Sequence, residues 1–114
     1  MVIQRKTKVT SLAEIKEIVE QHRAELKREF HVEKIGVFGS YARGDQKKRS
    51  DVDFLVMFDE PVSYLDLGGL KIFMEEITGL ESHVVPSYNL RLEFRDNVLK
   101  EVKYIEQAPE NISE

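Results

Sequence analysis

Residues 32–58 read VEKIGVFGSYARGDQKKRSDVDFLVMF and contain the pattern that decides the fold. The first part, Val32 to Phe38, is typical of a strand that ends at Gly39. The last part, Asp51 to Phe58, alternates as a strand does and is apolar on both faces except for the two aspartates at its start. A polar connection joins them, with two glycines and a basic cluster. We therefore expect two strands, with a short helical turn over residues 40–43 after the first.

Gly39 and Ser40 stand where the first strand ends and the helical turn begins. The first N–H groups of a helix have no backbone acceptor and carry a partial positive charge, so they suit a phosphate group. Glycine lets a ligand approach the backbone closely, and serine adds a hydroxyl donor. Because the same pair also occurs in ordinary turns, it indicates a phosphate site only in combination with residues further along the chain.

Asp51 and Asp53 supply that context, because positions i and i+2 of a strand face the same way. Their carboxylates are expected on one face, with backbone positions about 7 Å apart. At an effective dielectric of about 20 their repulsion is about 2 kcal/mol, and a bound divalent cation removes this cost. Magnesium takes hard oxygen ligands, commonly one or two carboxylates together with substrate phosphates. We favour this metal site over a strand cap beside a solvated aspartate.

The signature G-S-x10-D-x-D of the DNA polymerase β-like nucleotidyltransferases resembles the order found here, Gly39-Ser40, ten residues, then Asp51-Val52-Asp53. The finer match, GSYARG followed by SDVDFLV, is similar to small prokaryotic members called minimal nucleotidyltransferases (MNT). The resemblance covers roughly residues 30–105. It implies the nucleotidyltransferase fold, Mg²⁺ as cofactor and ATP as the nucleoside triphosphate. It also implies an antitoxin role, in which some members transfer AMP to a tyrosine of a helical HEPN toxin.

Carried over by position, the resemblance assigns triphosphate binding to Gly39 and Ser40 and magnesium ligation to Asp51 and Asp53. Arg43 matches the arginine of the family's R-G pair and is assigned to nucleotide binding, where it would neutralise phosphate charge.

An alternative role for Arg43 is an ion pair with Asp45 or Asp51 at the surface. Ser50 matches the serine that precedes the first aspartate, and we interpret it as a support for the start of the strand. The basic residues 47–49 are expected to form a solvated loop.

The sequence departs from the family at the third carboxylate, which normally stands on the next strand. Aligned on Pro86, the chain has His83 at that position. A histidine can accept a proton near neutral pH, so His83 is a candidate catalytic residue. It could equally be a weaker metal ligand or a surface residue, and Glu81 on the same strand face could replace the acid. Nucleotide and metal binding remain expected, whereas the catalytic rate is left open.

The other segments predict a helical framework around these strands. Ser11 and Glu14 have capping-box spacing and open a helix that runs to about Phe30. Its apolar face is expected to contain Leu12, Ile15, Ile18, Val19, His22 and Leu26. Leu65 to Thr78 is a second helix that Gly79 ends. Its inward residues are expected to be Leu67, Leu70, Phe73, Met74 and Ile77.

A short strand, Glu81 to Val85, and a last helix, Asn89 to about Val102, complete the order. The apolar stripe of that helix is expected to be Leu92, Val98, Leu99 and Val102. Residues 1–10 are expected to form a loose arm or a short edge strand, and the residues after Tyr104 are expected to fray. Single aromatic and histidine residues are assigned to structure: Phe54, Phe58, Phe73, His22 and His31 to packing or helix ends, and Tyr41 to an exposed position on the short helix.

This order predicts an α+β fold, a short mixed sheet flanked by about three helices, in a single domain over residues 1–114 with its motif core in 30–105. The 17 basic and 21 acidic residues give a net charge of −4, which disfavours long nucleic acid as a ligand. The chain has no cysteine and no apolar run long enough to cross a membrane, so we expect no membrane association and a cytoplasmic location.

Two hypotheses about function remain. The first is an Mg²⁺-dependent nucleotidyltransferase of the protein adenylyltransferase type. The second is a weak or inactive member that neutralises a partner by forming a complex, with His83 marking the lost activity. A partner protein is expected under both, and the sequence leaves homo- and hetero-oligomers open. A nucleic-acid-binding regulator is disfavoured by charge and by the lack of a basic aromatic surface.

Overall fold

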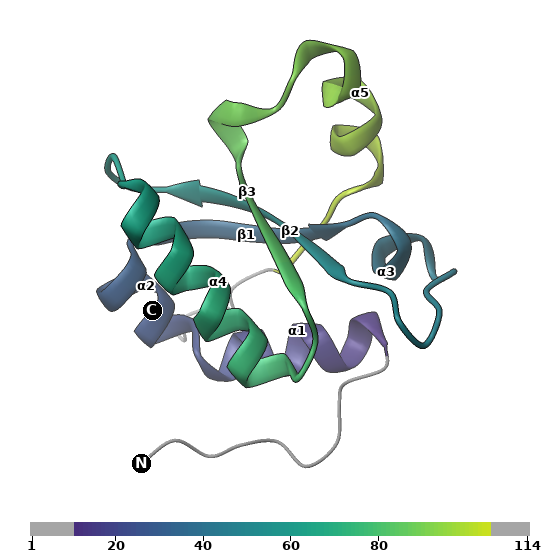
Figure 1. Cartoon of the computed structure of the whole chain (residues 1–114), viewed down its shortest axis with the longest axis horizontal. Helices are drawn as coiled ribbons and strands as arrows, with labels where there is room; N and C mark the ends of the chain where they lie inside the picture. Colours follow the sequence, from purple (N-terminus) through teal and green to yellow (C-terminus); the bar gives the residue numbers. More distant parts are fainter. Residues whose placement is uncertain (1–10, 106–114) are drawn as a thin grey trace, which may run out of the picture.

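A four-stranded mixed sheet with strand order β3-β2-β1-β4 forms the centre of the chain (Figure 1). The computed structural model describes residues 11–105. In chain order the elements are α1 Leu12–Gln21, α2 Arg23–Phe30, β1 Val32–Phe38, α3 Ser40–Arg43, β2 Val52–Phe58, α4 Tyr64–Thr78, β3 Ser82–Pro86, the 3-10 helix η1 Ser87–Asn89, α5 Leu92–Glu101 and β4 Lys103–Tyr104. The predicted α+β fold with a small mixed sheet is confirmed.

The two strands of the deciding stretch pair with each other in an antiparallel arrangement, with Phe38 opposite Asp53. Strand β3 lies parallel to β2 on its other side, because the chain returns through α4 before entering it. Strand β4 pairs antiparallel with β1 at Gly36 and Val37. The central position of β2 thus places its first residues between the end of β1 and the start of β3.

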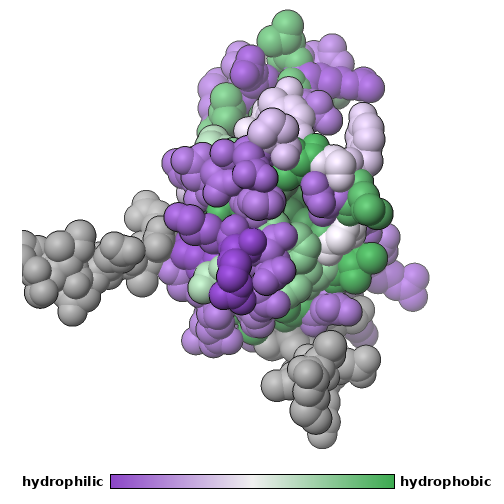
Figure 2. Space-filling view, turned by 90° about the vertical axis from the view of Figure 1, so that its left-hand side faces the viewer, coloured by the Kyte–Doolittle hydropathy of each residue, from purple (hydrophilic) through white to green (hydrophobic). Residues whose placement is uncertain are grey.

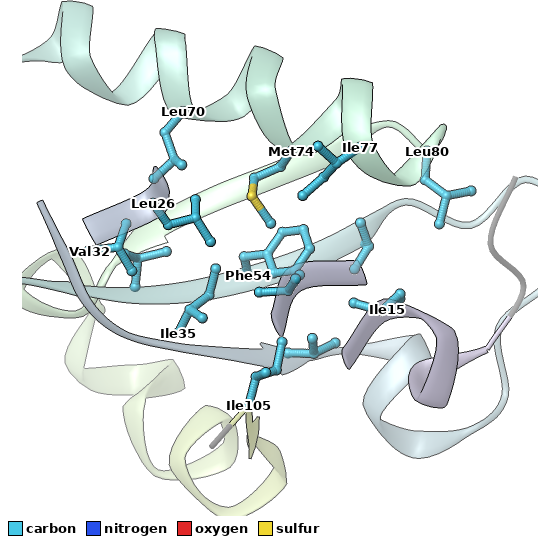
Figure 3. Packing of buried hydrophobic residues seen from close by; sticks show 14 of the residues in the cluster. Ile15, Leu26, Val32, Ile35, Phe54, Leu70, Met74, Ile77, Leu80 and Ile105 are labelled. Atoms are coloured by element: carbon cyan, nitrogen blue, oxygen red, sulfur yellow. The ribbon is translucent and has the colours of Figure 1, made fainter. Parts of the chain in front are cut away.

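The hydrophobic core lies between one face of the sheet and the layer formed by α1, α2 and α4 (Figure 3). Alternate residues of β2 face this layer, and they are Val52, Phe54 and Val56. The opposite face of β2 carries Asp53 and Leu55. Helix α5 lies on that second side, away from α4 (Figures 1 and 3). The acidic end of β2 is therefore on the side of α5.

The first helical segment ends at Phe30 as expected, but it is broken into two helices at His22. The backbone of His22 leaves helical geometry (φ −110°, ψ 16°), and its Nδ1 lies 2.8 Å from the carbonyl oxygen of Ile18. The ring also packs edge-on against Phe73 of α4, with ring centroids 5.6 Å apart. A single helix over this segment was therefore the wrong prediction, because a side chain that bonds its own backbone competes with the helical ladder.

Helix α4 begins and ends where its sequence signals stand. Ser63 accepts from the N–H of Asp66, and the Asp66 carboxylate accepts from the N–H of Ser63, which forms a complete capping box. Gly79 ends the helix in the left-handed region (φ 73°). A chain of polar contacts then fixes the next strand: Lys71 bonds Glu75, whose carboxylate accepts the N–H of Ser82 at the start of β3.

The last helix, α5, differs most from the prediction. It starts at Leu92 instead of Asn89, which belongs to η1. Of its expected apolar stripe, Val98 is buried, whereas Leu92 is 80% and Leu99 46% exposed. The helix lies on the far side of the sheet from the core (Figure 1), and most of its apolar residues remain exposed. The two-residue strand β4 that follows was not predicted.

The surface is otherwise mixed. Figure 2 shows a face on which hydrophilic residues predominate on one part, while hydrophobic residues gather along its side and at its top. Large apolar side chains exposed at the surface include Tyr64, Leu65 and Ile72 of α4. No helix within residues 11–105 combines the length and the apolarity that crossing a bilayer requires. The predictions made for residues 1–10 and for those beyond 105 lie outside the described residues.

Candidate active site

The two aspartates of the deciding stretch stand at the entrance to β2. Asp51 directly precedes the strand, and Asp53 is its second residue. His83 of β3 is the cross-strand partner of Asp53, and its Nε2 lies 2.9 Å from Oδ2 of Asp51. Because paired residues of adjacent strands point to the same face, the structure gathers all three side chains on the side of the sheet away from the core.

Gly39 faces this cluster from the end of β1. Its backbone has φ 80° and ψ −153°, a conformation that residues with a Cβ rarely adopt. A Cβ atom on Gly39 would overlap with Oδ2 of Asp53. Glycine is therefore required twice here, by the backbone angle and by the close approach of the carboxylate. The strand-to-helix turn and the acidic strand end form one compact unit.

Helix α3 follows at once and carries Ser40 and Arg43 beside the turn. Ser40 is the first residue of the helix, and Gly39 N-caps it. The guanidinium of Arg43 bonds Asp45 through Nε (3.2 Å) and Glu101 through Nη1 (2.8 Å). Among the described residues, then, Arg43 pairs with Asp45 as one alternative predicted, and with Glu101 instead of Asp51. These bonds raise the pKa of Arg43, so it stays a cation in the site.

Glu101 is the residue of this region that the sequence did not indicate. It ends α5, and its Oε2 accepts a 2.7 Å bond from the N–H of Gly39. Its other oxygen accepts from Arg43, so the carboxylate rests between the backbone turn and the cation. No local pattern marks this residue, because its partners lie 62 and 58 positions earlier in the chain.

The negative charges in the site act on one another. Partial burial raises the pKa of the Asp53 carboxyl above its ordinary value, and the charges of Asp51 and Glu101 act in the same direction. His83 and Arg43 act in the opposite direction. A carboxylate whose ionised form is disfavoured by burial and by like charges gains most from a nearby cation.

These residues fit a magnesium ion in their chemistry. Asp51 and Asp53 offer hard carboxylate oxygens on one face, and His83 engages one oxygen of Asp51. The ligand atoms of Asp51, Asp53 and His83 do not all lie close enough together to form a three-residue metal site. Within residues 11–105, the only group of three whose ligand atoms do so lies elsewhere. Two carboxylates that leave the remaining positions to phosphates and water are typical of Mg²⁺ at nucleotide sites.

That other group consists of His31, Asp59 and Glu60, at the opposite end of β2. The two ring nitrogens of His31 face different carboxylates, at 3.6 Å from Asp59 and 3.4 Å from Glu60. His31 caps α2 in the left-handed region (φ 59°), and its carbonyl accepts the N–H of Asp59. These contacts fit the structural role expected of His31.

One side chain near the site lies elsewhere than predicted. Tyr41 is 3% exposed and belongs to the core, so its expected exposed position was wrong. The four-residue helix lays its second residue inward against the sheet, and burial, with the charge of Asp51, raises the pKa of the phenol. Glu81 precedes β3 and lines a hollow with Lys71 and Glu75.

Comparison with known proteins identifies relatives of this chain. Residues 19–105 match the family model described as the nucleotidyltransferase domain. The protein adenylyltransferase MntA of Thermococcus cleftensis is 42% identical over 95 residues, which is 83% of this chain and 96% of that protein.

Solved structures share the fold. One described as "putative minimal nucleotidyltransferase" superposes with a TM-score of 0.70 at 29% identity, covering 85% of this chain and 98% of that one. Another contains a tri-AMPylated HEPN toxin of Shewanella oneidensis in complex with an MNT antitoxin. It has a TM-score of 0.59 at 16% identity, with 82% of this chain and 73% of that chain covered.

Proposed function

The chain belongs to the nucleotidyltransferase domain family, as a minimal nucleotidyltransferase, and from this premise we propose that it transfers AMP from ATP to a hydroxyl group of a partner protein. The observation that carries the proposal is the joint placement of Asp51 and Asp53 on one face, next to the Gly39 turn. Acids that can hold a divalent cation then lie beside backbone that can approach a phosphate.

The proposed reaction needs charge neutralisation and alignment more than covalent help from the protein. Asp51 and Asp53 would hold Mg²⁺, which when bound polarises the phosphate oxygens. Gly39 and Ser40 receive the triphosphate, and Arg43 offsets its negative charge. The acceptor oxygen attacks the α-phosphorus, the bond to the β-phosphate breaks, and pyrophosphate leaves.

His83 has two roles in this proposal. Its bond to Asp51 holds that carboxylate in place, and an imidazole can accept the proton that the attacking hydroxyl loses. Glu81 is not assigned this role, since it lines the hollow beside Lys71 and Glu75.

We propose a HEPN-type toxin as the partner and one of its tyrosines as the acceptor. Support comes from the 42% identical relative, which is named a protein adenylyltransferase, and from the fold neighbour in which an MNT antitoxin accompanies an AMPylated HEPN toxin. The exposed apolar residues of α4 and α5 are suited to contact with another protein.

The test follows labelled AMP from ATP to a co-expressed partner. Asp51→Asn and Asp53→Asn each keep the side-chain shape but remove the charge, so labelling should fall at least roughly a hundredfold. Asp59→Asn, at the other end of β2, is the matched control and should label like the wild type. Equal labelling by the wild type and both site variants would show that these carboxylates are wrongly assigned.

A second candidate function is a binding module that neutralises its partner by complex formation alone. The observation in its favour is the place of the third acid, where His83 stands and already bonds Asp51. On this hypothesis Asp51→Asn still forms a stable complex with the partner by size-exclusion chromatography, and the wild type does not label it. If the wild type labels the partner and Asp51→Asn does not, the result favours the enzyme over the binding module.

A further inference from the structure

The side chain that occupies the turn of the candidate site is Glu101, and its contacts are those of a bound anion. One oxygen accepts the N–H of Gly39 at 2.7 Å and the other accepts from Arg43 at 2.8 Å. A backbone N–H beside a guanidinium is the donor set that a phosphate oxygen takes at such turns. Neither donor hydrogen can serve Glu101 and a phosphate fully at the same time.

We propose that Glu101 is an internal competitor of the nucleotide: its carboxylate fills the phosphate position at Gly39 and Arg43 in the ligand-free protein, and it must leave when a triphosphate binds. The inference rests on the proposed function, because it concerns the phosphates of that nucleotide. It adds an autoinhibitory contact that sets the affinity of the site.

Charge supports a contact that can be broken. The carboxylate of Glu101 acts on Asp53 as a like charge, as does that of Asp51. In this position Glu101 adds a negative charge beside Asp51 and Asp53. Its ion pair with Arg43 is only partly shielded from water, because the side chain of Glu101 is 24% exposed and that of Arg43 is 51% exposed. When Glu101 leaves, this repulsion is relieved. The arriving triphosphate then supplies negative charge to Arg43, and its cation supplies positive charge to Asp51 and Asp53.

The position of Glu101 lets it leave without disturbing the core. It ends α5, a helix in which Val98 is the buried residue and positions 92–97 are all exposed. The strand that follows is held separately, since Lys103 and Tyr104 pair with β1 and the N–H of Ile105 donates to the carbonyl of Ile35. A rotation of one side chain, or a shift of the end of α5, is therefore sufficient.

Titration calorimetry tests the proposal with two probes, ATP with Mg²⁺ and inorganic tripolyphosphate. Glu101→Gln keeps the side-chain size but removes the charge, and its single amide oxygen can accept only one of the two hydrogen bonds. Both probes should therefore bind roughly tenfold tighter. Glu93→Gln on the exposed first turn of the same helix is the matched control and should bind as the wild type does. Thermal unfolding shows that each variant is folded.

Two calorimetric results for the variant would overturn the inference, and a change in the Gly39 amide provides a further check. Unchanged affinity in Glu101→Gln means that the carboxylate does not compete, and weaker binding means that Glu101 holds Arg43 in place for the phosphate. The amide resonance of Gly39 gives an independent readout. It should shift between wild type and Glu101→Gln without ligand, and an unmoved resonance shows that the contact is absent in solution.

The outcome is separable from that of the proposed function. If AMP transfer fails but Glu101→Gln still binds tripolyphosphate more tightly, the proposed reaction falls and the competitor stands. If AMP transfer succeeds and the variant binds both probes like the wild type, the competitor alone is wrong. If neither protein binds either probe, the site takes no phosphate and the inference falls.

Discussion

Gly39 and Gly44 flank the same four-residue helix, and both have positive φ angles, 80° and 83°. Their ψ angles and their surroundings differ: Gly44 lies in the left-handed region (ψ 12°), whereas Gly39 has ψ −153°. A Cβ on Gly39 would overlap the Asp53 carboxylate, whereas a Cβ on Gly44 would have nothing within 4 Å. The pair thus compares a glycine that only its backbone angle requires with one that also makes room for the Asp53 carboxylate.

We predict that Gly44→Ala destabilises the protein by about 1–2 kcal/mol through strain alone and keeps AMP transfer. Gly39→Ala should lose at least as much stability and should also abolish transfer, because Asp53 must move. Urea unfolding measures the first effect and AMP labelling of the partner the second. Comparable activity in the two alanine variants would show that the contact between Gly39 and Asp53 has no part in function.

At the residue scale, the sequence predicts what depends on local geometry. Strand alternation is enough to place Asp51 and Asp53 on one face. Gly39 was expected to admit a phosphate, and the approach of the Asp53 carboxylate to it was not foreseen. Glu101 could not be foreseen, because its position depends on a helix that packs little and on a strand of two residues. Tyr41 was misplaced for a related reason: a single turn has no periodicity from which its inner face can be inferred.

At the scale of elements, the capping box of α4 allows a test of helix stability. Ser63→Ala removes the side-chain acceptor of the Asp66 N–H and should lower the free energy of unfolding by about 1 kcal/mol. Ser63→Asn, which keeps an accepting oxygen, should be close to the wild type. Urea denaturation at neutral pH measures both variants, and equal stability of all three proteins would contradict the assigned cap.

The same box predicts a dependence on pH. Hydrogen bonds from the Ser63 backbone and side chain lower the pKa of Asp66 in the folded protein. Its contribution to stability is therefore complete above the unfolded pKa of about 4 and is lost as the pH falls through the lower folded value. The stability difference between wild type and Asp66→Asn should be constant near neutral pH and should shrink in acid. A difference that grows in acid would contradict this assignment.

The sequence predicted best the bounds of those helices and strands that have clear signals at their ends and a buried face. Helix α4 and strand β1 have the bounds that their sequences indicate to within a residue. The break at His22 was missed because it involves a side-chain bond to Ile18 and a ring contact with Phe73 of α4. The late start of α5 was missed because Asn89 belongs to the separate helix η1. Apolar residues at helical spacing indicate a packing face only where the fold supplies a surface to meet it.

At the scale of the whole molecule, stability should come from one side of the sheet. Leu70 of α4 is fully buried in the core, whereas Leu65 on the same helix is 85% exposed. Leu70→Ala should therefore cost about 2–5 kcal/mol of unfolding free energy. Leu65→Ala should change it by less than about 0.5 kcal/mol. Chemical denaturation compares the two, and equal costs would contradict the placement of the core.

Competition from an internal carboxylate changes how the site fills as the ligand concentration rises. Apparent affinity equals the intrinsic affinity multiplied by the fraction of molecules whose site is vacant, so about 90% self-occupancy weakens it tenfold. Such a protein remains far from saturation at ligand concentrations that would fill a site without the competing carboxylate. Its occupancy then continues to rise over a higher range of ligand concentration. The carboxylate at the end of α5 would then determine the range of ligand concentration over which the site fills.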